Sequence, residues 1–216
     1  IKRIISLSGG SLFILPFILK IPLIEIKRFI YKIDFQKMCD YEDFSINHIL
    51  LKHGLFNNNY ISSVLEECLR LKGYSKDFSF LDLFKVSNID FICRVYNLTD
   101  NCEESINYIS HPHLPVSKVI QMTTCIPILF TPISHEGKLY IDGGIINNYP
   151  IDINTSPHYL GICIADDVET KEIYTNFIEY IQLIIRIISS KRKNDKKTIY
   201  ISGSLKDVIN FDCPMN

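Results

Sequence analysis

Hydrophobic and polar positions follow two different periods along this chain. Short apolar runs rich in β-prone residues predict strands over residues 2–7, 90–97, 138–141, 158–164 and 198–202. Between these runs, apolar residues recur at helical spacing and predict helices over residues 11–19, 59–72, 80–84, 116–124 and 175–191. Strands that alternate with helices are typical of an α/β fold with a mostly parallel sheet.

Proline and apolar spacing define the expected helices near the start. We expect the first helix to be broken or kinked at Pro16, because proline lacks the N–H that a helix uses. Pro22 suits the first turn of a second helix, whose apolar face would carry Leu23, Ile26, Ile30 and Ile33. The helix over 59–72 would bury Ile61, Val64, Leu65, Cys68 and Leu71.

Length and hydrophobicity indicate one domain. Of the 216 residues, 47% are hydrophobic, which is enough for a sizeable core. No internal repeat or long linker divides the sequence, so we expect residues 1–216 to form one domain, with residues 175–216 as its C-terminal helix and strand. Because the chain begins at Ile1 inside an apolar run, we expect it to be truncated at its N-terminus.

Charge and cysteine content limit the classes of function. The formal net charge is −1 and no strongly basic or acidic block occurs, which argues against nucleic acid as the main partner. Seven cysteines are scattered without a CxxC pair, so neither a disulfide framework nor a structural zinc site is expected. We expect a reducing compartment, the cytoplasm, and no metal or other cofactor.

Two apolar stretches raise the question of a membrane. Residues 12–24 are too short and too interrupted by proline and lysine to span a bilayer, and no cleavage site of a signal peptide follows them. We expect this stretch and residues 177–188 to be core helices. Peripheral contact with a membrane is the alternative, because the basic run 191–193 would suit an anionic surface.

The most informative segment is Tyr-Ile-Asp-Gly-Gly-Ile-Ile-Asn-Asn-Tyr-Pro at residues 140–150. A strand ends at Asp142, and Gly143 and Gly144 then allow a sharp turn. Asn148 and Pro150 are further turn formers. A carboxylate at a strand end on such a loop suits catalysis, although a solvated aspartate in an ordinary turn would give the same pattern.

Ser8 is the candidate nucleophile. A strand, a tight turn and a helix with serine at the apex form a nucleophile elbow, whose usual pattern is G-x-S-x-G. Here Ser6 replaces the first glycine and Gly10 keeps the second. We expect both positions to be small because bulk there would clash with the neighbouring strand or helix. The N–H of Gly9, at a helix N-terminus, would stabilise an oxyanion. An ordinary glycine turn is the alternative.

A serine nucleophile also needs a base. Asp142 can act directly on Ser8, or it can orient His158 in the order Ser, Asp, His of an α/β-hydrolase triad. His111 and His113 flank a proline in an expected loop, and we interpret them as surface residues, with metal binding as the less favoured alternative.

Three segments together resemble the patatin-like phospholipase family. Residues 6–12 resemble its nucleophile elbow and the helix that follows, and residues 116–132 resemble the helix and loop before its catalytic aspartate. Residues 140–150 resemble its D-G-[GA] motif and the N-x-P that follows. With weaker agreement elsewhere, the resemblance covers most of residues 1–165.

The resemblance implies a three-layer α/β sandwich with a Ser–Asp dyad. Ser8 would be the nucleophile and Asp142 the base, in the hydrolysis of fatty-acyl esters of a phospholipid or another acyl lipid, without a metal. The supporting motif positions would be Ser6, Gly9, Gly10, Gly143, Gly144, Asn148 and Pro150. The family's glycine-rich oxyanion loop precedes the elbow and has no counterpart in this sequence. A non-catalytic lipid-binding or interaction module of the same fold is therefore the alternative.

Overall fold

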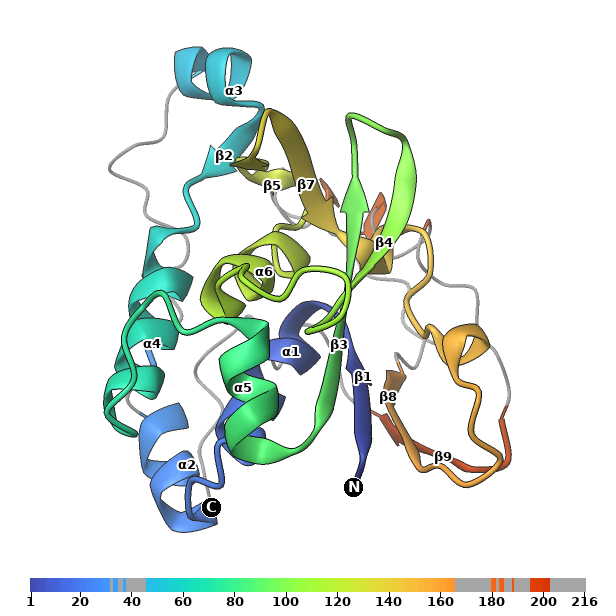
Figure 1. Ribbon diagram of the computed structural model, residues 1–216. Helices are drawn as coiled ribbons and strands as arrows, with labels where there is room; N and C mark the ends of the chain where they lie inside the picture. Colours follow the sequence, from blue (N-terminus) through green and yellow to red (C-terminus); the bar gives the residue numbers. More distant parts are fainter. Residues whose placement is uncertain are drawn as a thin grey trace.

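The computed structural model describes residues 1–31, 33, 34, 37, 46–165, 180, 181, 183, 184, 188 and 195–202. Its elements (Figure 1) are, in chain order, β1 (Arg3–Ser6), α1 (Ser8–Ile18), α2 (Leu23–Ile30), α3 (Ile46–Lys52), β2 (Gly54–Phe56), α4 (Asn59–Arg70), α5 (Phe80–Ser87), β3 (Asp90–Asn97), β4 (Cys102–Ile106), α6 (Val116–Thr123), β5 (Ile128–Phe130), β6 (Ile133–His135), β7 (Lys138–Asp142), the 3-10 turns η3 (Gly143–Ile145) and η4 (Ile151–Ile153), β8 (Gly161–Ala165) and β9 (Thr198–Ser202).

The central sheet is organised around β3. It has five strands: β1 and β7 pair with successive parts of one edge of β3, β4 pairs with the other edge, and β6 pairs with β7. β1 runs parallel to β3, whereas β4 and β7 run antiparallel to it, and β6 runs antiparallel to β7. Two further pairs, β2·β5 and β8·β9, are parallel. The predicted α/β class is confirmed, and strands of both directions make up the central sheet.

The sequence predicts a mostly parallel sheet, and hairpins account for two of the antiparallel pairs among the described strands, β3·β4 and β6·β7. β6 and β7 are joined by Glu136 and Gly137, which both have positive φ, at 49° and 76°. This is the two-residue hairpin turn that matches the twist of the strands. β3 and β4 are joined by a short turn in which Asn101 has a φ of 55°. Strands joined by such short turns can only pair antiparallel.

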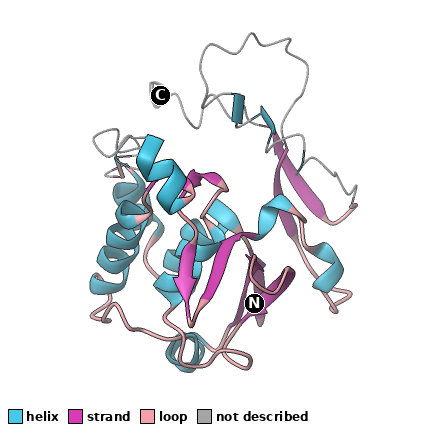
Figure 2. Ribbon diagram, turned by 90° about the horizontal axis from the view of Figure 1, so that it is seen from above, coloured by secondary structure: helices cyan, strands magenta, loops and turns pink. Residues whose placement is uncertain are grey.

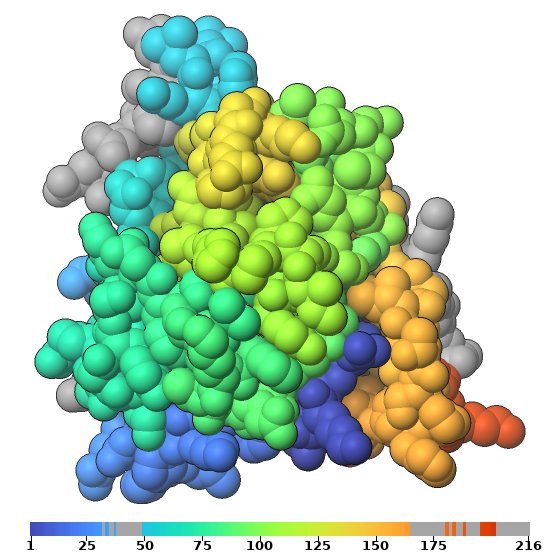
Figure 3. All heavy atoms as spheres, in the orientation of Figure 1, coloured from blue at the N-terminus to red at the C-terminus, as the bar shows by residue number. Residues whose placement is uncertain are grey.

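Helices α1, α4 and α6 lie on one side of the central strands, and β8 and β9 lie on the other (Figures 1 and 2). α6 is the innermost helix, and six of its residues are buried, from Val116 to Thr123. The space-filling view shows α2, α4 and α5 as one continuous surface beside β1, in dark blue (Figure 3).

Side chains of the sheet alternate between two hydrophobic clusters. Val95 and Tyr140 belong to the larger cluster, which the buried residues of α1, α4 and α6 share. Their chain neighbours Tyr96 and Ile141 belong to the second cluster, which contains Leu55, Phe56, Phe130 and Ile181. Successive residues of a strand point to opposite faces, so both faces of the sheet are covered, as a layered sandwich requires.

Several predicted helices are confirmed, but some of the residues that they bury differ from the prediction. α1 continues through Pro16 to Ile18, so the helix is not broken there. In α2, Leu23 is 77% exposed, because it lies in the first turn and faces away from the core. In α4 the buried side includes Leu69 in place of Leu71, which follows the end of the helix and is half exposed.

The last predicted elements are only partly described. The run 158–164 predicts a buried strand, but β8 pairs with β9 alone among the described strands, and Ile162 and Ile164 are 63% and 69% exposed. β9 confirms the strand predicted over 198–202. The helix predicted over 175–191 falls largely outside the described residues. Among the residues that the structure describes, no helix is both long enough and apolar enough to cross a bilayer.

Candidate active site

The site lies where two strands of the central sheet run toward each other. β1 and β7 both pair with the edge of β3 that is opposite β4. β1 ends with Ser6 beside Cys93, and β7 ends with Asp142 beside Val95. Because β1 is parallel and β7 antiparallel to β3, their C-terminal ends meet at Arg94, the residue between these partners. The turns that follow the two strands therefore start from neighbouring points.

Ser8 has the backbone of a nucleophile elbow. Leu7 is extended, α1 begins at Ser8, and Ser8 itself has a φ of 50°, in the left-handed region. A residue other than glycine in this region is strained, at a cost of about 1–3 kcal/mol, and persists when its surroundings hold it. Here the backbone N–H of Ser8 donates to Oγ1 of Thr123 at 2.8 Å. The strained turn is thus tied to the end of α6.

Ser8 and Asp142 are in direct contact. The Oγ of Ser8 donates to Oδ2 of Asp142 at 2.5 Å, across 134 positions of the chain. The other carboxylate oxygen, Oδ1, accepts the backbone N–H of Gly144 at 2.8 Å, so the turn after β7 fixes the orientation of the carboxylate. A serine hydroxyl in a short hydrogen bond to a carboxylate is the arrangement in which the carboxylate can remove the hydroxyl proton.

Burial makes Asp142 a stronger base than an ordinary aspartate. Its side chain is 5% exposed, and burial raises its pKa from 3.8 to about 6 because the charged form is poorly solvated. The hydrogen bonds from Ser8 and Gly144 act in the opposite direction, since they stabilise the carboxylate. A pKa near neutrality suits a general base, which must be ionised and yet accept a proton readily.

Comparison with known proteins identifies the family. The model of the patatin-like phospholipase family matches residues 1–154. The chain belongs to the patatin-like phospholipase family.

Two viral relatives and one solved structure extend this result. "Probable lipid hydrolase 463L" of Invertebrate iridescent virus 6 is 34% identical over 105 residues, which cover 49% of this chain and 36% of that protein. "Uncharacterized protein R571" of Acanthamoeba polyphaga mimivirus is 27% identical over 222 residues, 98% of this chain and 73% of that protein. The crystal structure of VipD from Legionella pneumophila shares the fold at 12% identity, with a TM-score of 0.54 over 93% of this chain and 55% of VipD. The chain thus spans about a third of the first relative and about half of VipD.

The glycines of the family's D-G-[GA] motif lie at closely packed positions. A Cβ on Gly143 would lie 3.1 Å from the carbonyl oxygen of Arg94, in the backbone of β3. A Cβ on Gly144 would lie 3.1 Å from Oδ1 of Asp142 and 3.2 Å from Oδ1 of Asn148. Asn148 is exposed, and Pro150, which closes the motif, is buried.

The steric clash expected for bulk at Gly10 is not found in the structure. A Cβ on either glycine would meet no atom within 4 Å, so bulk at Gly10 would not clash with a neighbouring element. Both glycines are exposed, because they lie on the outer side of the first turn of α1. Their backbone N–H groups have no acceptor within the helix, as is general for a first turn. They are the candidate oxyanion donors, because the N–H of Ser8 is bound to Thr123.

Ser6 fits where the family pattern has glycine. Its hydroxyl lies 2.7 Å from the hydroxyl of Ser11 in α1, and Ser11 also lies 3.4 Å from the thiol of Cys93. The extra polar atom therefore has a partner, and the substitution leaves the contact between Ser8 and Asp142 in place.

The alternative assignments gain no support from the geometry. His158 is exposed, and its hydrogen bonds to Ser156 use its backbone, while Asp142 contacts Ser8 without an intervening histidine. His111 bonds to neighbouring Ser110. Within the described parts of the chain, no cluster of three or more metal-ligating side chains occurs.

Two thiols near the site are poor nucleophiles. Burial raises the pKa of Cys93 and of Cys125 to about 12, and the charge of Asp142 adds to the shift in both. A thiol with this pKa stays protonated at neutral pH, and only the thiolate is reactive. Ser8 is therefore the nucleophile candidate that the geometry favours.

Sequence reasoning did not single out Thr123 or Arg94 as parts of the site. The available signal was a Thr-Thr pair at the end of an otherwise apolar helix, and an arginine inside an apolar strand. Both residues are buried, at 0% and 7% exposure. Buried polar side chains are kept where they have partners, which makes such positions informative once the fold is known.

Proposed function

We propose that this chain hydrolyses fatty-acyl esters of a phospholipid or a related lipid, with Ser8 as the nucleophile and Asp142 as the base. The observation that carries the proposal is the 2.5 Å hydrogen bond from the Ser8 hydroxyl to the buried carboxylate of Asp142. The family of the chain and the printed name of its iridescent virus relative support a lipid as the substrate.

In the first half of the proposed reaction, the Oγ of Ser8 attacks the ester carbonyl carbon while its proton passes to Asp142. The carbonyl oxygen becomes an oxyanion, for which the N–H groups of Gly9 and Gly10 are the candidate donors. The bond to the alcohol oxygen then breaks, and the alcohol leaves with the proton from Asp142. The fatty acid remains as an ester on Ser8.

In the second half, a water molecule attacks the acyl group and Asp142 accepts the proton of that water. The fatty acid leaves, and Ser8 recovers its hydroxyl proton from Asp142. Each step uses the same carboxylate as base and then as acid, which a pKa of about 6 allows at neutral pH.

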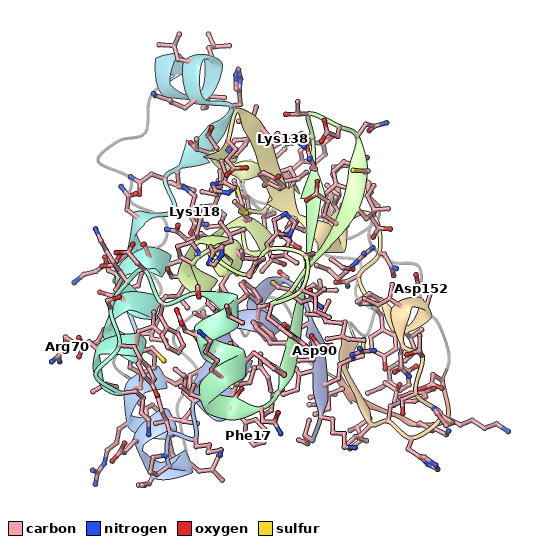
Figure 4. The ribbon with its side chains drawn as sticks, viewed as in Figure 1. Phe17, Arg70, Asp90, Lys118, Lys138 and Asp152 are labelled. Carbon is pink, nitrogen blue, oxygen red and sulfur yellow. The ribbon has the colours of Figure 1, made fainter. Side chains whose placement is uncertain are left out.

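A lipid substrate requires contact with a membrane, and α1 has a suitable surface. Phe13 and Phe17 are 43% and 46% exposed and one turn apart, on the side of the helix that begins with Gly9. Figure 4 shows Phe17 near the lower edge of the molecule. The exposed Lys20 and Lys27 follow in the chain, and lysines that accompany exposed apolar residues are typical of proteins that bind anionic lipid surfaces. We propose peripheral binding through this stripe.

The thiols of the described residues are compatible with the cytoplasm as the site of action. Cys68, Cys93, Cys102, Cys125 and Cys163 are all free. Free cysteines are common in reducing compartments.

A non-catalytic lipid-binding module is the second candidate. It is favoured by the hydrogen bond from the Ser8 N–H to Thr123, because this N–H is then not available to stabilise an oxyanion. The N–H groups of Gly9 and Gly10 are the candidates that remain. Loss of one such donor costs about 3–4 kcal/mol of transition-state stabilisation.

Covalent labelling separates the two candidates. A fluorophosphonate should label the protein at Ser8, and both Ser8→Ala and Asp142→Asn should abolish labelling and hydrolysis of a phospholipid in vesicles. Ser63→Ala is the matched control, because Ser63 is exposed on α4 and bonds only to its own helix. Vesicle binding without labelling of Ser8 in the folded protein would favour the binding module.

A further inference from the structure

We propose that Thr123 is a positioning residue, which holds Ser8 in the strained conformation from which it can attack a substrate. This inference rests on the proposed hydrolysis by Ser8 and Asp142, and it concerns a residue that touches neither substrate nor the reacting atoms.

The hydroxyl of Thr123 joins two separate segments. Its Oγ1 accepts the N–H of Ser8 at 2.8 Å and donates its own proton to the carbonyl oxygen of Arg94 at 2.6 Å. A hydroxyl has only one proton, so donation to Arg94 leaves the oxygen lone pairs for the Ser8 N–H. Thr123 is 0% exposed, so water does not compete for either bond.

The elbow depends on this contact because α1 has no cap of its own. Leu7, at the N-cap position, makes no side-chain hydrogen bond to the first turn. The left-handed backbone of Ser8 is thus held by an acceptor that comes from the end of α6. Without the acceptor, Ser8 would have a partly buried N–H without its partner and could relax to a conformation with negative φ.

The backbone carbonyl of Arg94 also packs against the turn that carries Asp142, the proposed base. The carbonyl of Arg94, which receives the Thr123 proton, lies 3.1 Å from where a Cβ of Gly143 would be. The guanidinium of Arg94 is fixed in turn by Ser105 at 2.7 Å and by Glu103 at 2.9 Å. Thr123 therefore connects the Ser8 turn to the strand position against which the Asp142 turn is packed, and so sets the distance between hydroxyl and carboxylate.

Thr124 provides a matched control on the neighbouring position. It is 6% exposed, and its hydroxyl donates to the carbonyls of Ile120 at 2.8 Å and Gln121 at 3.2 Å, both in its own helix. Thr124→Val thus removes an equally buried hydroxyl without touching Ser8. Thr123→Val removes the link to Ser8 at nearly constant volume, and Thr123→Ser keeps it.

The test measures kcat and KM for a soluble short-chain ester, and the rate of fluorophosphonate labelling, on the whole protein. We expect Thr123→Val to lower kcat and the labelling rate by roughly 100-fold, because a displacement of about 1 Å at the nucleophile has effects of this size. KM should change by less than about three-fold, since the substrate contacts remain. Thr123→Ser should restore most of the rate, and Thr124→Val should stay close to wild type.

A Thr123→Val protein as active as wild type would overturn the proposal, as would failure of Thr123→Ser to rescue, or an equal loss in Thr124→Val. If Thr123→Val does not fold, Thr123→Ala takes its place in the same comparison. Absence of labelling in the wild type would instead contradict the proposed hydrolysis itself. The failure of the proposed function and that of the positioning role are therefore distinguishable.

Discussion

At the scale of single residues, the main feature is a carboxyl group kept out of water beside a hydroxyl. Asp142 is buried, hydrogen-bonded by Ser8 and Gly144, and makes no ion pair within the described residues. Among the described residues no positive charge offsets the loss of hydration, and burial therefore raises the pKa of Asp142 to about 6. This single shift has opposite consequences for activity and for stability.

Activity should increase with pH through the pKa of Asp142. Only the ionised carboxylate can accept the Ser8 proton, so we expect kcat/KM for a soluble ester to rise about ten-fold per pH unit below about 6 and to level off above it. The measurement is a pH–rate profile between pH 4.5 and 8. A profile that is flat through this range would contradict the role of Asp142 as base.

The contribution of Asp142 to the stability of the folded protein should decrease as pH rises. The pKa of Asp142 is higher in the folded state than its usual 3.8, so its stabilising contribution is complete below about pH 4 and lost as pH rises through about 6. Asp142→Asn, which cannot ionise, should then raise the free energy of unfolding by up to about 3 kcal/mol at pH 8, with no gain at pH 4.

Urea unfolding of the wild type and of Asp142→Asn at both pH values would check this prediction. Asp100→Asn is the control, because Asp100 is exposed and its pKa is lowered by its hydrogen bond to Lys138, so its removal should not stabilise the protein at pH 8. The prediction would be contradicted if Asp142→Asn raised the free energy of unfolding, relative to wild type, by no more at pH 8 than at pH 4.

At the scale of elements, the turn after β7 requires glycine for steric reasons. Gly143→Ala would place a Cβ 3.1 Å from the carbonyl oxygen of Arg94, and a strand backbone cannot move aside cheaply. We expect a loss of about 1–3 kcal/mol in unfolding free energy and a lower kcat, because the turn that carries Asp142 would shift. Thermal unfolding and ester hydrolysis would measure the two effects.

Gly10→Ala is the control for this prediction. A Cβ there meets no atom within 4 Å, and alanine in a helix is favoured over glycine by up to about 1 kcal/mol, so stability should stay equal or rise. An equal loss of stability in both variants would show that close packing is not the cause.

Much of the element order follows from the sequence, because long runs with a clear period fix the type of element. The limits predicted for β3, α6 and β9 agree with the structure to within a residue. Short strands such as β2, β5 and β6 were not predicted, since three residues show no period. Pairing direction could not be predicted either, because β1 and β7 each pair with β3, a strand that is distant from both of them in the sequence.

The candidate site could be predicted in its central pair but not in its supports. Ser8 and Asp142 lie in motifs with glycines, which mark turns in the sequence. Thr123 could not be assigned because its role depends on Ser8 and Arg94, which are 115 and 29 positions away. The steric argument for Gly10 was wrong, because the strain lies in Ser8 itself, at a φ of 50°.

At the scale of the whole molecule, the exposed stripe of Phe13 and Phe17 on α1 is the proposed contact with a lipid surface. Phe13→Ser with Phe17→Ser should weaken binding to anionic phospholipid vesicles by at least about ten-fold, since two partly exposed aromatic side chains would no longer be buried in lipid. Co-sedimentation measures binding, and hydrolysis of a soluble ester should remain unchanged.

Leu50→Ser with Leu51→Ser is the matched pair on α3. These leucines are 68% and 75% exposed but lie on an element remote in sequence from the elbow. If both double variants bound vesicles equally well, α1 would not be the membrane contact.

Because the C-terminal ends of β1 and β7 face each other along β3, the proposed reaction would depend on the length of β3. One residue added between Cys93 and Val95 would separate the two strand ends by about 3.3 Å and turn one partner to the opposite face of the sheet. The hydroxyl and the carboxylate could then no longer touch, although every residue of both motifs would still be present. Relatives that keep both motifs but differ by an insertion at this point would be expected to have lost the reaction.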